Sequence, residues 1–90
     1  MSVKVHIHRT FRHITNNLAI VEVKGETVGE CLKDLIRQFP GLKIKLFKRN
    51  DKLHNHIEIY INNESAFPYE LSKQVKDGDE ITPILMISGG

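Results

Sequence analysis

Apolar and polar side chains alternate near the start of the chain in a pattern that predicts two strands. Residues 3–7 alternate valine or isoleucine with lysine or histidine, which is the period of a half-buried strand. Residues 15–17, Thr-Asn-Asn, supply the side chains that favour a turn. Residues 18–23 are then rich in β-branched residues and end before Gly25. We therefore expect the chain to open with a β-hairpin.

The pattern changes to a helical one after Gly25. Thr27 is followed three residues later by Glu30, which is the spacing of a capping box at a helix start. Apolar residues then recur three and four positions apart, as on one face of a helix. Pro40 disfavours helical geometry at the residue before it, so we expect the helix to end there. The expected apolar face consists of Val28, Cys31, Leu32, Leu35, Ile36 and Phe39.

Residues 57–61 alternate isoleucine with glutamate and tyrosine, and they predict a third strand. Asn62 and Asn63 follow it as turn residues, because asparagine tolerates positive φ. Residues 64–76 show no clear period. Within them we expect Phe67 and Leu71 to anchor the segment to the core.

Residues 77–79, Asp-Gly-Asp, predict a tight turn, and residues 81–87 predict the last strand. Pro83 lies inside that strand and cannot donate a ladder hydrogen bond, so we expect a bulge or an unpaired position there.

This order of elements predicts an α+β fold. A hairpin, a helix, a strand, an irregular crossover and a final strand fit one main helix packed on a mixed sheet of four to five strands. Handedness rules make the β-grasp topology of ubiquitin-like proteins the natural arrangement for this order. We expect residues 1–87 to form the β-grasp domain and residues 88–90 to form a C-terminal tail.

Composition is ordinary for a globular domain and narrows the function little. The 90 residues are 40% hydrophobic and 27% charged. The sequence has neither an apolar run of ~20 residues nor the layout of a signal peptide, so we expect a cytoplasmic protein with no membrane partner. Cys31 is the sole cysteine, which excludes an internal disulfide and a multi-cysteine zinc site. Its place on the apolar helix face favours a core residue.

The histidines invite a metal hypothesis. His6 and His8 share one expected strand face, and His54 and His56 have the same spacing. No cysteine or carboxylate set completes either pair, so we predict no metal site.

Positive charge is concentrated in one segment. The net charge is +2, but residues 43–52 hold five lysines or arginines against Asp51 alone. We favour a solvated loop, with binding to an acidic partner or to a phosphate backbone as the alternative.

The chain ends in Ser88-Gly89-Gly90 directly after an apolar strand. Glycine has no Cβ, so such an ending adds nothing to a core. It provides a thin arm that enters a narrow cleft and presents a terminal carboxylate. A frayed terminus that happens to be glycine is the alternative interpretation.

The tail is not isolated. Gly78-Asp79-Glu80-Ile81, followed by an apolar strand and Ser88-Gly89-Gly90, resembles the closing signature of the MoaD/ThiS family of ubiquitin-like sulfur-carrier proteins. The stretch Leu46-Phe47, Asp51-Lys52-Leu53 and His56-Ile57 is similar to the archaeal branch, the small ubiquitin-like modifier proteins. The resemblance covers essentially the whole chain.

The sequence also departs from the family. Leu85 and Met86 replace a proline pair that often precedes the tail, so the arm lacks that stiffening. Asn63 stands at a turn position where relatives commonly carry glycine. His8 and Ile84 stand where relatives often have aromatic residues that contact a partner enzyme.

The resemblance implies a carrier rather than an enzyme. An E1-like enzyme would use ATP to adenylate Gly90, and a persulfide would convert it to a thiocarboxylate for molybdopterin, thiazole or tRNA thiolation. The same end would form isopeptide bonds with protein lysines in archaeal relatives. Catalytic acids and bases would belong to the partner, and no cofactor would be bound by this chain. No catalytic constellation in the sequence argues otherwise.

Docking of that partner requires exposed apolar side chains near the arm. If Ile81, Pro83, Leu85 and Ile87 share one strand face, Ile84 and Met86 lie on the other. We therefore name Ile84 and Met86 as docking residues. Phe67 is a further candidate, for which a core position is the favoured reading.

Three functional hypotheses follow. The favoured one is a sulfur carrier or protein modifier acting through Gly89 and Gly90, monomeric when free. A second is a non-covalent β-grasp module that binds RNA through residues 43–52, although nucleic acid is the less favoured partner. A third is the small subunit of a two-chain synthase of the molybdopterin-synthase type, whose large subunit receives the tail.

Overall fold

The structure is a computed structural model that describes residues 2–85 of the chain. Met86, Ile87, Gly89 and Gly90 therefore lie outside the described residues, as does the proposed 88–90 tail. The strands are β1 (Val3–His6), β2 (Ile20–Val23), β3 (Ile57–Ile61), β4 (Glu64–Ser65) and β5 (Glu80–Leu85), and the α-helices are α1 (Val28–Gln38) and α2 (Lys43–Leu46). Three short 3₁₀ helices span Arg9–Phe11 (η1), Pro40–Leu42 (η2) and Glu70–Ser72 (η3).

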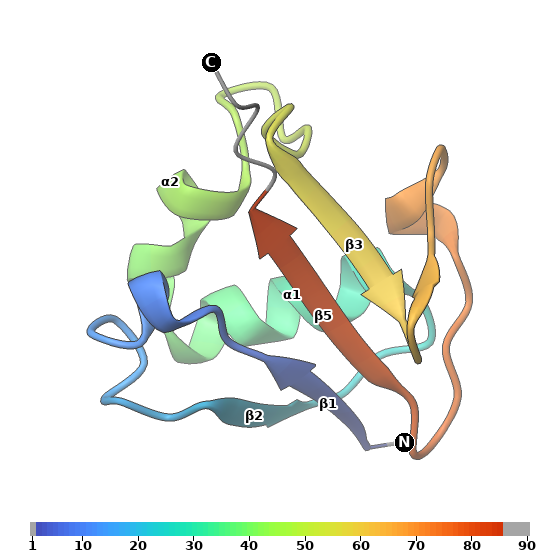
Figure 1. Cartoon of the computed structure of the whole chain (residues 1–90), viewed down its shortest axis with the longest axis horizontal. Helices are drawn as coiled ribbons and strands as arrows, with labels where there is room; N and C mark the ends of the chain where they lie inside the picture. Colours follow the sequence, from blue (N-terminus) through green and yellow to red (C-terminus); the bar gives the residue numbers. More distant parts are fainter. Residues whose placement is uncertain (1, 86–90) are drawn as a thin grey trace.

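The five strands form one mixed sheet in the order β2-β1-β5-β3-β4. The central pair, β1 and β5, runs parallel, and every other pair is antiparallel. Helix α1 crosses one face of this sheet, and the other face is left open (Figure 1). This is the β-grasp arrangement, so the predicted α+β class and topology are confirmed.

Pro83 sits in β5 without a bulge. It lies directly opposite Ile59 in a continuous antiparallel register with β3. The Asn62 N–H donates to the Glu80 carbonyl at 2.9 Å, so Asn62 and Glu80 form a hydrogen-bonded pair. Hydrogen-bonded and non-hydrogen-bonded pairs alternate along an antiparallel ladder. Ile59 and Pro83, three positions further along, therefore form a non-hydrogen-bonded pair. The Pro83 nitrogen therefore points toward β1, whose pairing with β5 has ended at Val5 and Ile81. The expected bulge or unpaired position is therefore wrong: β5 stays paired with β3 at Pro83, because the missing N–H falls on the side away from β3.

Helix α1 begins as predicted. The Thr27 hydroxyl accepts from the Glu30 N–H at 3.2 Å, while the Glu30 carboxylate accepts from the Glu26 N–H at 2.9 Å. The carboxylate thus reaches one residue further back than in a standard capping box. At the other end, the Phe39 N–H donates to the Leu35 carbonyl, and Pro40 starts a 3₁₀ turn.

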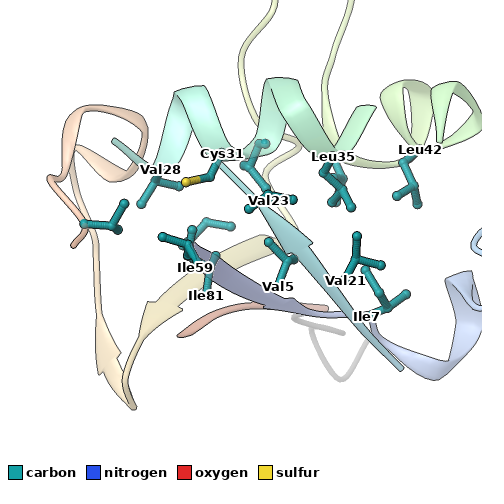
Figure 2. Close-up of a cluster of buried hydrophobic side chains, with 14 of the residues drawn as sticks. Val5, Ile7, Val21, Val23, Val28, Cys31, Leu35, Leu42, Ile59 and Ile81 are labelled. Carbon is teal, nitrogen blue, oxygen red and sulfur yellow. The ribbon is translucent and has the colours of Figure 1, made fainter. Parts of the chain in front are cut away.

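The core lies between α1 and the covered face of the sheet. Figure 2 shows helix side chains such as Val28 and Leu35 directed toward strand side chains such as Val5 and Ile81. Cys31 lies among them with no exposed surface, which confirms its predicted core position. The alternating residues of β1 and β2 point inward in the same way. The strand and helix periods read from the sequence therefore converge on one apolar layer.

Several segments depart from the prediction. The second strand begins at Ile20 rather than at residue 18, because residues 15–18 form hydrogen-bonded turns. Residues 43–46 form the helix α2 instead of a solvated loop, since Leu42 and Leu46 are buried and hold this turn on the core. The segment after β3 contains a two-residue strand and the turn η3.

Two loops that are distant in sequence are joined at the start of β5. The Asp79 carboxylate accepts from the Asn62 side-chain amide and from the Lys76 N–H, each at 2.9 Å. The Asn62 side-chain carbonyl in turn accepts from the Glu80 N–H at 2.9 Å. Asp79 is only 8% exposed. These hydrogen bonds, that from Asn62 above all, lower the pKa of Asp79 below its usual value.

We expect Asp79→Ala to lower the free energy of unfolding by about 1–3 kcal/mol at pH 7, because Asn62 and Lys76 lose their acceptor. The Asp79 pKa is depressed in the folded state, so its contribution is full above the unfolded pKa and is lost as pH falls through the folded pKa. Urea unfolding at pH 7 and at pH 3 measures both effects. The gap between wild type and variant should shrink at pH 3, and an equal gap at both pH values would contradict this. Asp77→Ala, at an exposed neighbouring carboxylate, should cost less.

Candidate functional site

Residues 81–85 of β5 direct their side chains alternately to the two faces of the sheet. Ile81 and Pro83 are buried, and Leu85 packs against the core. Ile84 lies on the opposite, open face, across from Glu58 of β3, and is half-buried. The predicted division of the strand faces is therefore confirmed for residues 81–85. Ile84 is the docking candidate whose position the structure describes.

A depression lies beside Ile84, on the β1 side of β5. Strand β1 pairs with β5 only at Lys4–Glu80 and Val5–Ile81, and then turns away, whereas β5 continues to Leu85. The resulting opening has a volume of about 350 Å³. We call it the β1–β5 notch; its lining residues are His6, Ile7, His8, Arg9, Arg12, Thr82, Pro83 and Ile84. His8 and Ile84, singled out separately in the sequence, thus line one surface.

The histidines of the notch have defined hydrogen-bond partners. His6 Nε2 lies 2.5 Å from the Glu80 carboxylate. His8 Nδ1 accepts from the Thr10 N–H at 3.2 Å and lies 2.8 Å from the Thr10 hydroxyl. Within residues 2–85, no group of three or more histidine, cysteine, aspartate or glutamate side chains is placed to hold a metal ion. The His6–His8 pair is not part of such a group.

Phe67 does not anchor its segment. Its side chain is 70% exposed, and that of Tyr69 is 74% exposed, so the expected core position of Phe67 is wrong. Leu71 performs the anchoring role, because η3 packs closely over Gly29 at the start of α1. Phe67 instead lines a wide groove of about 840 Å³, together with Leu53, Ile57, Pro68 and Tyr69. Ile57 pairs with Leu85, so this groove begins one strand away from the end of β5.

The basic segment 43–52 is partly ordered by its own contacts. The Lys48 ammonium donates to the Asn55 side chain at 2.8 Å, and Phe47 forms a bridge with Leu53. His54 lies 2.9 Å from the Ile44 carbonyl, and its ring stacks on His56 at 5.2 Å between ring centres. This second histidine pair is therefore a stacked pair.

Cys31 is unsuited to nucleophilic chemistry. Burial, assisted by the nearby Glu30 and Asp34 carboxylates, raises the pKa of its thiol from 9.0 to about 11. A thiol with this pKa carries almost no thiolate near neutral pH, and thiolate is the reactive form.

Within residues 2–85, no helix combines the length and the apolar character that crossing a membrane requires.

Comparison with known proteins gives the family. The sequence profile of the ThiS family matches residues 5–90, which include the Gly-Gly end. The chain belongs to the ThiS family. Its expected resemblance to MoaD/ThiS proteins and to archaeal modifiers is confirmed. The family contains ubiquitin-like sulfur carriers and modifiers.

The relatives of this ThiS-family chain include a protein named as a sulfur carrier and one named as an archaeal modifier. It is 31% identical to the sulfur carrier protein CysO of Mycobacterium tuberculosis over 93 residues, with full coverage of both chains. It is 34% identical to the small archaeal modifier protein 1 of Haloferax volcanii over 71 residues, 78% of each chain. Among solved structures, the Amycolatopsis orientalis BexX/CysO complex contains a chain with a TM-score of 0.88 and 38% identity, covering 98% of this chain and 99% of that one.

Sequence reasoning missed Arg9 and Arg12 as members of a surface next to β5. Both lie in the connection after β1, in and just beyond a 3₁₀ turn that the apolar pattern did not predict. Their position depends on where β1 leaves the sheet, which no local pattern encodes.

The raised Cys31 pKa predicts an alkaline loss of stability. The unfolded thiol loses its proton near pH 9.0, whereas the folded one keeps it until about 11, so the folded state binds more protons in between. The free energy of unfolding should therefore fall by about 2 kcal/mol between pH 9 and pH 11. Urea unfolding of wild type and Cys31→Ala at pH 8 and pH 10.5 isolates this contribution, since other groups titrate in both proteins. Parallel losses in the two proteins would contradict the prediction.

Proposed function

We propose that this ThiS-family chain is a carrier whose chemistry takes place on the C-terminal carboxylate of Gly90. The observation that carries the proposal is the family match, which runs through β5 to residue 90 and includes Gly89 and Gly90. The architecture supports it, because β5 is a central strand that leads directly toward the tail. The raised pKa of the buried Cys31 thiol also supports the proposal. A buried thiol that keeps its proton near neutral pH is a poor nucleophile, so Cys31 is a weak candidate for the reacting group.

The proposed reaction begins with activation of the carboxylate. A free carboxylate is a poor acyl donor, because its leaving group would be oxide. An E1-like enzyme would direct a Gly90 carboxylate oxygen to the α-phosphorus of ATP, which forms an acyl adenylate and releases pyrophosphate. A persulfide of the partner would then attack the carbonyl carbon, with AMP leaving. Reduction of the resulting acyl disulfide by a thiol would release the thiocarboxylate, the sulfur donor for molybdopterin or tRNA thiolation.

The same adenylate would also serve protein modification. Attack by a lysine amine on the activated carbonyl would form an isopeptide bond and release AMP. The similarity to both a sulfur carrier and an archaeal modifier supports keeping both outcomes within one proposal. Intact mass of the protein from its native cell distinguishes them. Exchange of one oxygen for sulfur at the C-terminus indicates a carrier, and Gly-Gly remnants on other proteins indicate a modifier.

The folded domain contributes docking rather than catalysis in this proposal. Ile84 offers an apolar side chain on the open face next to the end of β5. Phe67 offers a larger one across β3, in the groove that begins beside Ile57. Met86 follows the described residues in sequence and is proposed as the third docking residue. The enzyme that acts on Gly90 would supply the acids, bases and ATP site.

Removal of Gly90, or addition of one alanine after it, should abolish ATP-dependent formation of the adenylate and thiocarboxylate. The reacting carbonyl would be displaced by one residue, about 3.5 Å, from its place in the partner's active site. Release of AMP and intact mass measure the loss, and circular dichroism with thermal unfolding checks that the domain persists. Normal product formation by either altered chain would refute the proposal.

Ile84→Asp should raise KM for the carrier in the adenylation reaction by about tenfold or more, because an interface apolar anchor is replaced by a charge. The value of kcat should change little. ATP–pyrophosphate exchange with the E1-like enzyme of the same organism measures both. Leu18→Asp makes the same chemical change at an exposed residue in the β1–β2 connection and should leave KM unchanged. Equal KM values for the two variants would count against Ile84 as a docking residue.

A further inference from the structure

The β1–β5 notch has an electrostatic character that the proposed function does not use. Its basic side chains are His6, His8, Arg9 and Arg12, and no carboxylate lines it. Two ion pairs are present within residues 2–85: His6 with Glu80, and Arg37 with Asp34. Neither Arg9 nor Arg12 is therefore neutralised by a carboxylate of the described chain. Two positive charges remain at one small opening.

The polar groups of the notch are arranged as donors. Arg12 Nε donates to the Ile7 carbonyl at 3.1 Å, which holds the guanidinium at the notch and leaves its terminal nitrogens for another acceptor. His8 Nδ1 accepts from the Thr10 N–H, so the neutral ring carries its proton on Nε2. Arg9 is exposed and has donors only. A ligand that fits these groups must supply acceptors, and a negatively charged one fits best.

The apolar part of the notch narrows the ligand class further. Ile84 supplies half-buried aliphatic surface beside the arginines, and the buried Ile7 and Pro83 line the notch with it. A glutamate or aspartate side chain joins a short apolar stem to a carboxylate that binds arginine in a bidentate manner. A single-stranded nucleic acid needs a longer basic track with aromatic platforms for its bases. The lining of the notch offers aliphatic walls and a volume of about 350 Å³ instead.

The length of the remaining chain places a partner over this notch. Five residues follow Leu85, and a fully extended segment of that length spans at most about 17 Å. An enzyme that holds Gly90 in its active site must therefore have surface within this reach of the end of β5. Ile84 and Pro83, directly before Leu85, form one wall of the notch. The surface of that enzyme around the entrance to its active site would therefore lie next to Arg9 and Arg12.

The geometry points to the β1–β5 notch as the binding site for an acidic segment of the protein that receives the Gly-Gly end. Carboxylates of that segment pair with Arg9 and Arg12, and its apolar side chains pack on Ile84. This assignment rests on the proposed function for the identity of the partner. It adds the chemistry of the docking contact and two specificity residues, Arg9 and Arg12.

The first test is kinetic. With the E1-like enzyme of the same organism, Arg9→Glu should raise KM for the carrier about tenfold at low salt and leave kcat unchanged. The effect should shrink to about two- to threefold near 1 M salt, where the Debye length is about 3 Å. Arg12→Gln should act in the same direction, and its thermal unfolding is measured because it loses the bond to Ile7. Lys33→Glu makes the same charge change on exposed α1 and should leave KM unchanged.

A second test does not depend on the enzyme. Backbone amide shifts of the ¹⁵N-labelled full chain are followed on titration with acetyl-LEELDE-amide, with its uncharged analogue acetyl-LQQLNQ-amide and with a ten-nucleotide oligouridylate. The acidic peptide should shift residues 7–12 and 82–85, and Arg9→Glu should remove these shifts. The two other probes should leave them unchanged.

The outcomes separate the two proposals. If wild-type chain is not adenylated at all, the proposed function fails and the titration alone decides on the notch. Equal KM values for Arg9→Glu and Lys33→Glu overturn the assignment, as does the absence of shifts with the acidic peptide. Stronger shifts with the oligonucleotide than with the peptide overturn it as well, in favour of a nucleic-acid ligand.

Discussion

The fold depends on the parallel pairing of β1 with β5 in the middle of the sheet. This ladder is short, with Lys4–Glu80 and Val5–Ile81 as its registered pairs, yet it joins the first strand of the chain to the last. Asp79 reinforces this ladder in two ways. Its backbone carbonyl accepts a hydrogen bond from the Lys4 N–H, and its side-chain carboxylate accepts one from the Asn62 side-chain amide. The position of every side chain on β5 follows from this junction, including that of Ile84.

Along β5, the residues that hold the fold together lie at one end, and those proposed to contact a partner lie at the other. The Gly78-Asp79-Glu80 signature lies at the start of β5, where Asp79 binds the neighbouring turn. Ile84 and the notch lie at the other end, next to the residues that lead to Gly90. The signature therefore has a structural role, while the proposed reacting group, the carboxylate of Gly90, stands about ten residues away.

The apolar periodicity of the sequence was sufficient to predict the helix α1 and the strand β3. It was insufficient to predict which side chains lie exposed or line the notch. The apolar face that begins at Val28 and the alternation around Ile59 predicted α1 and β3, because both patterns report burial against the same layer. Phe67 was misjudged because a large apolar residue favours burial on average, whereas the turns around it leave its side chain in solvent. The notch arginines were missed because their neighbours come from β5, about 70 residues later in the chain. Tertiary placement of that kind has no local signal.

The orientation of Pro83 has a consequence for the colloidal behaviour of the protein. Where β1 leaves, the edge of β5 faces an opening, and an exposed edge with free N–H and C=O groups is a template for pairing with other chains. Pro83 presents its imide nitrogen on that side, so an incoming strand finds no donor at the middle of the edge. Proline here keeps the opening accessible to a side-chain ligand while discouraging intermolecular β-sheet growth. Under the proposed function, in which partners approach the end of β5, the same proline limits self-association through that edge.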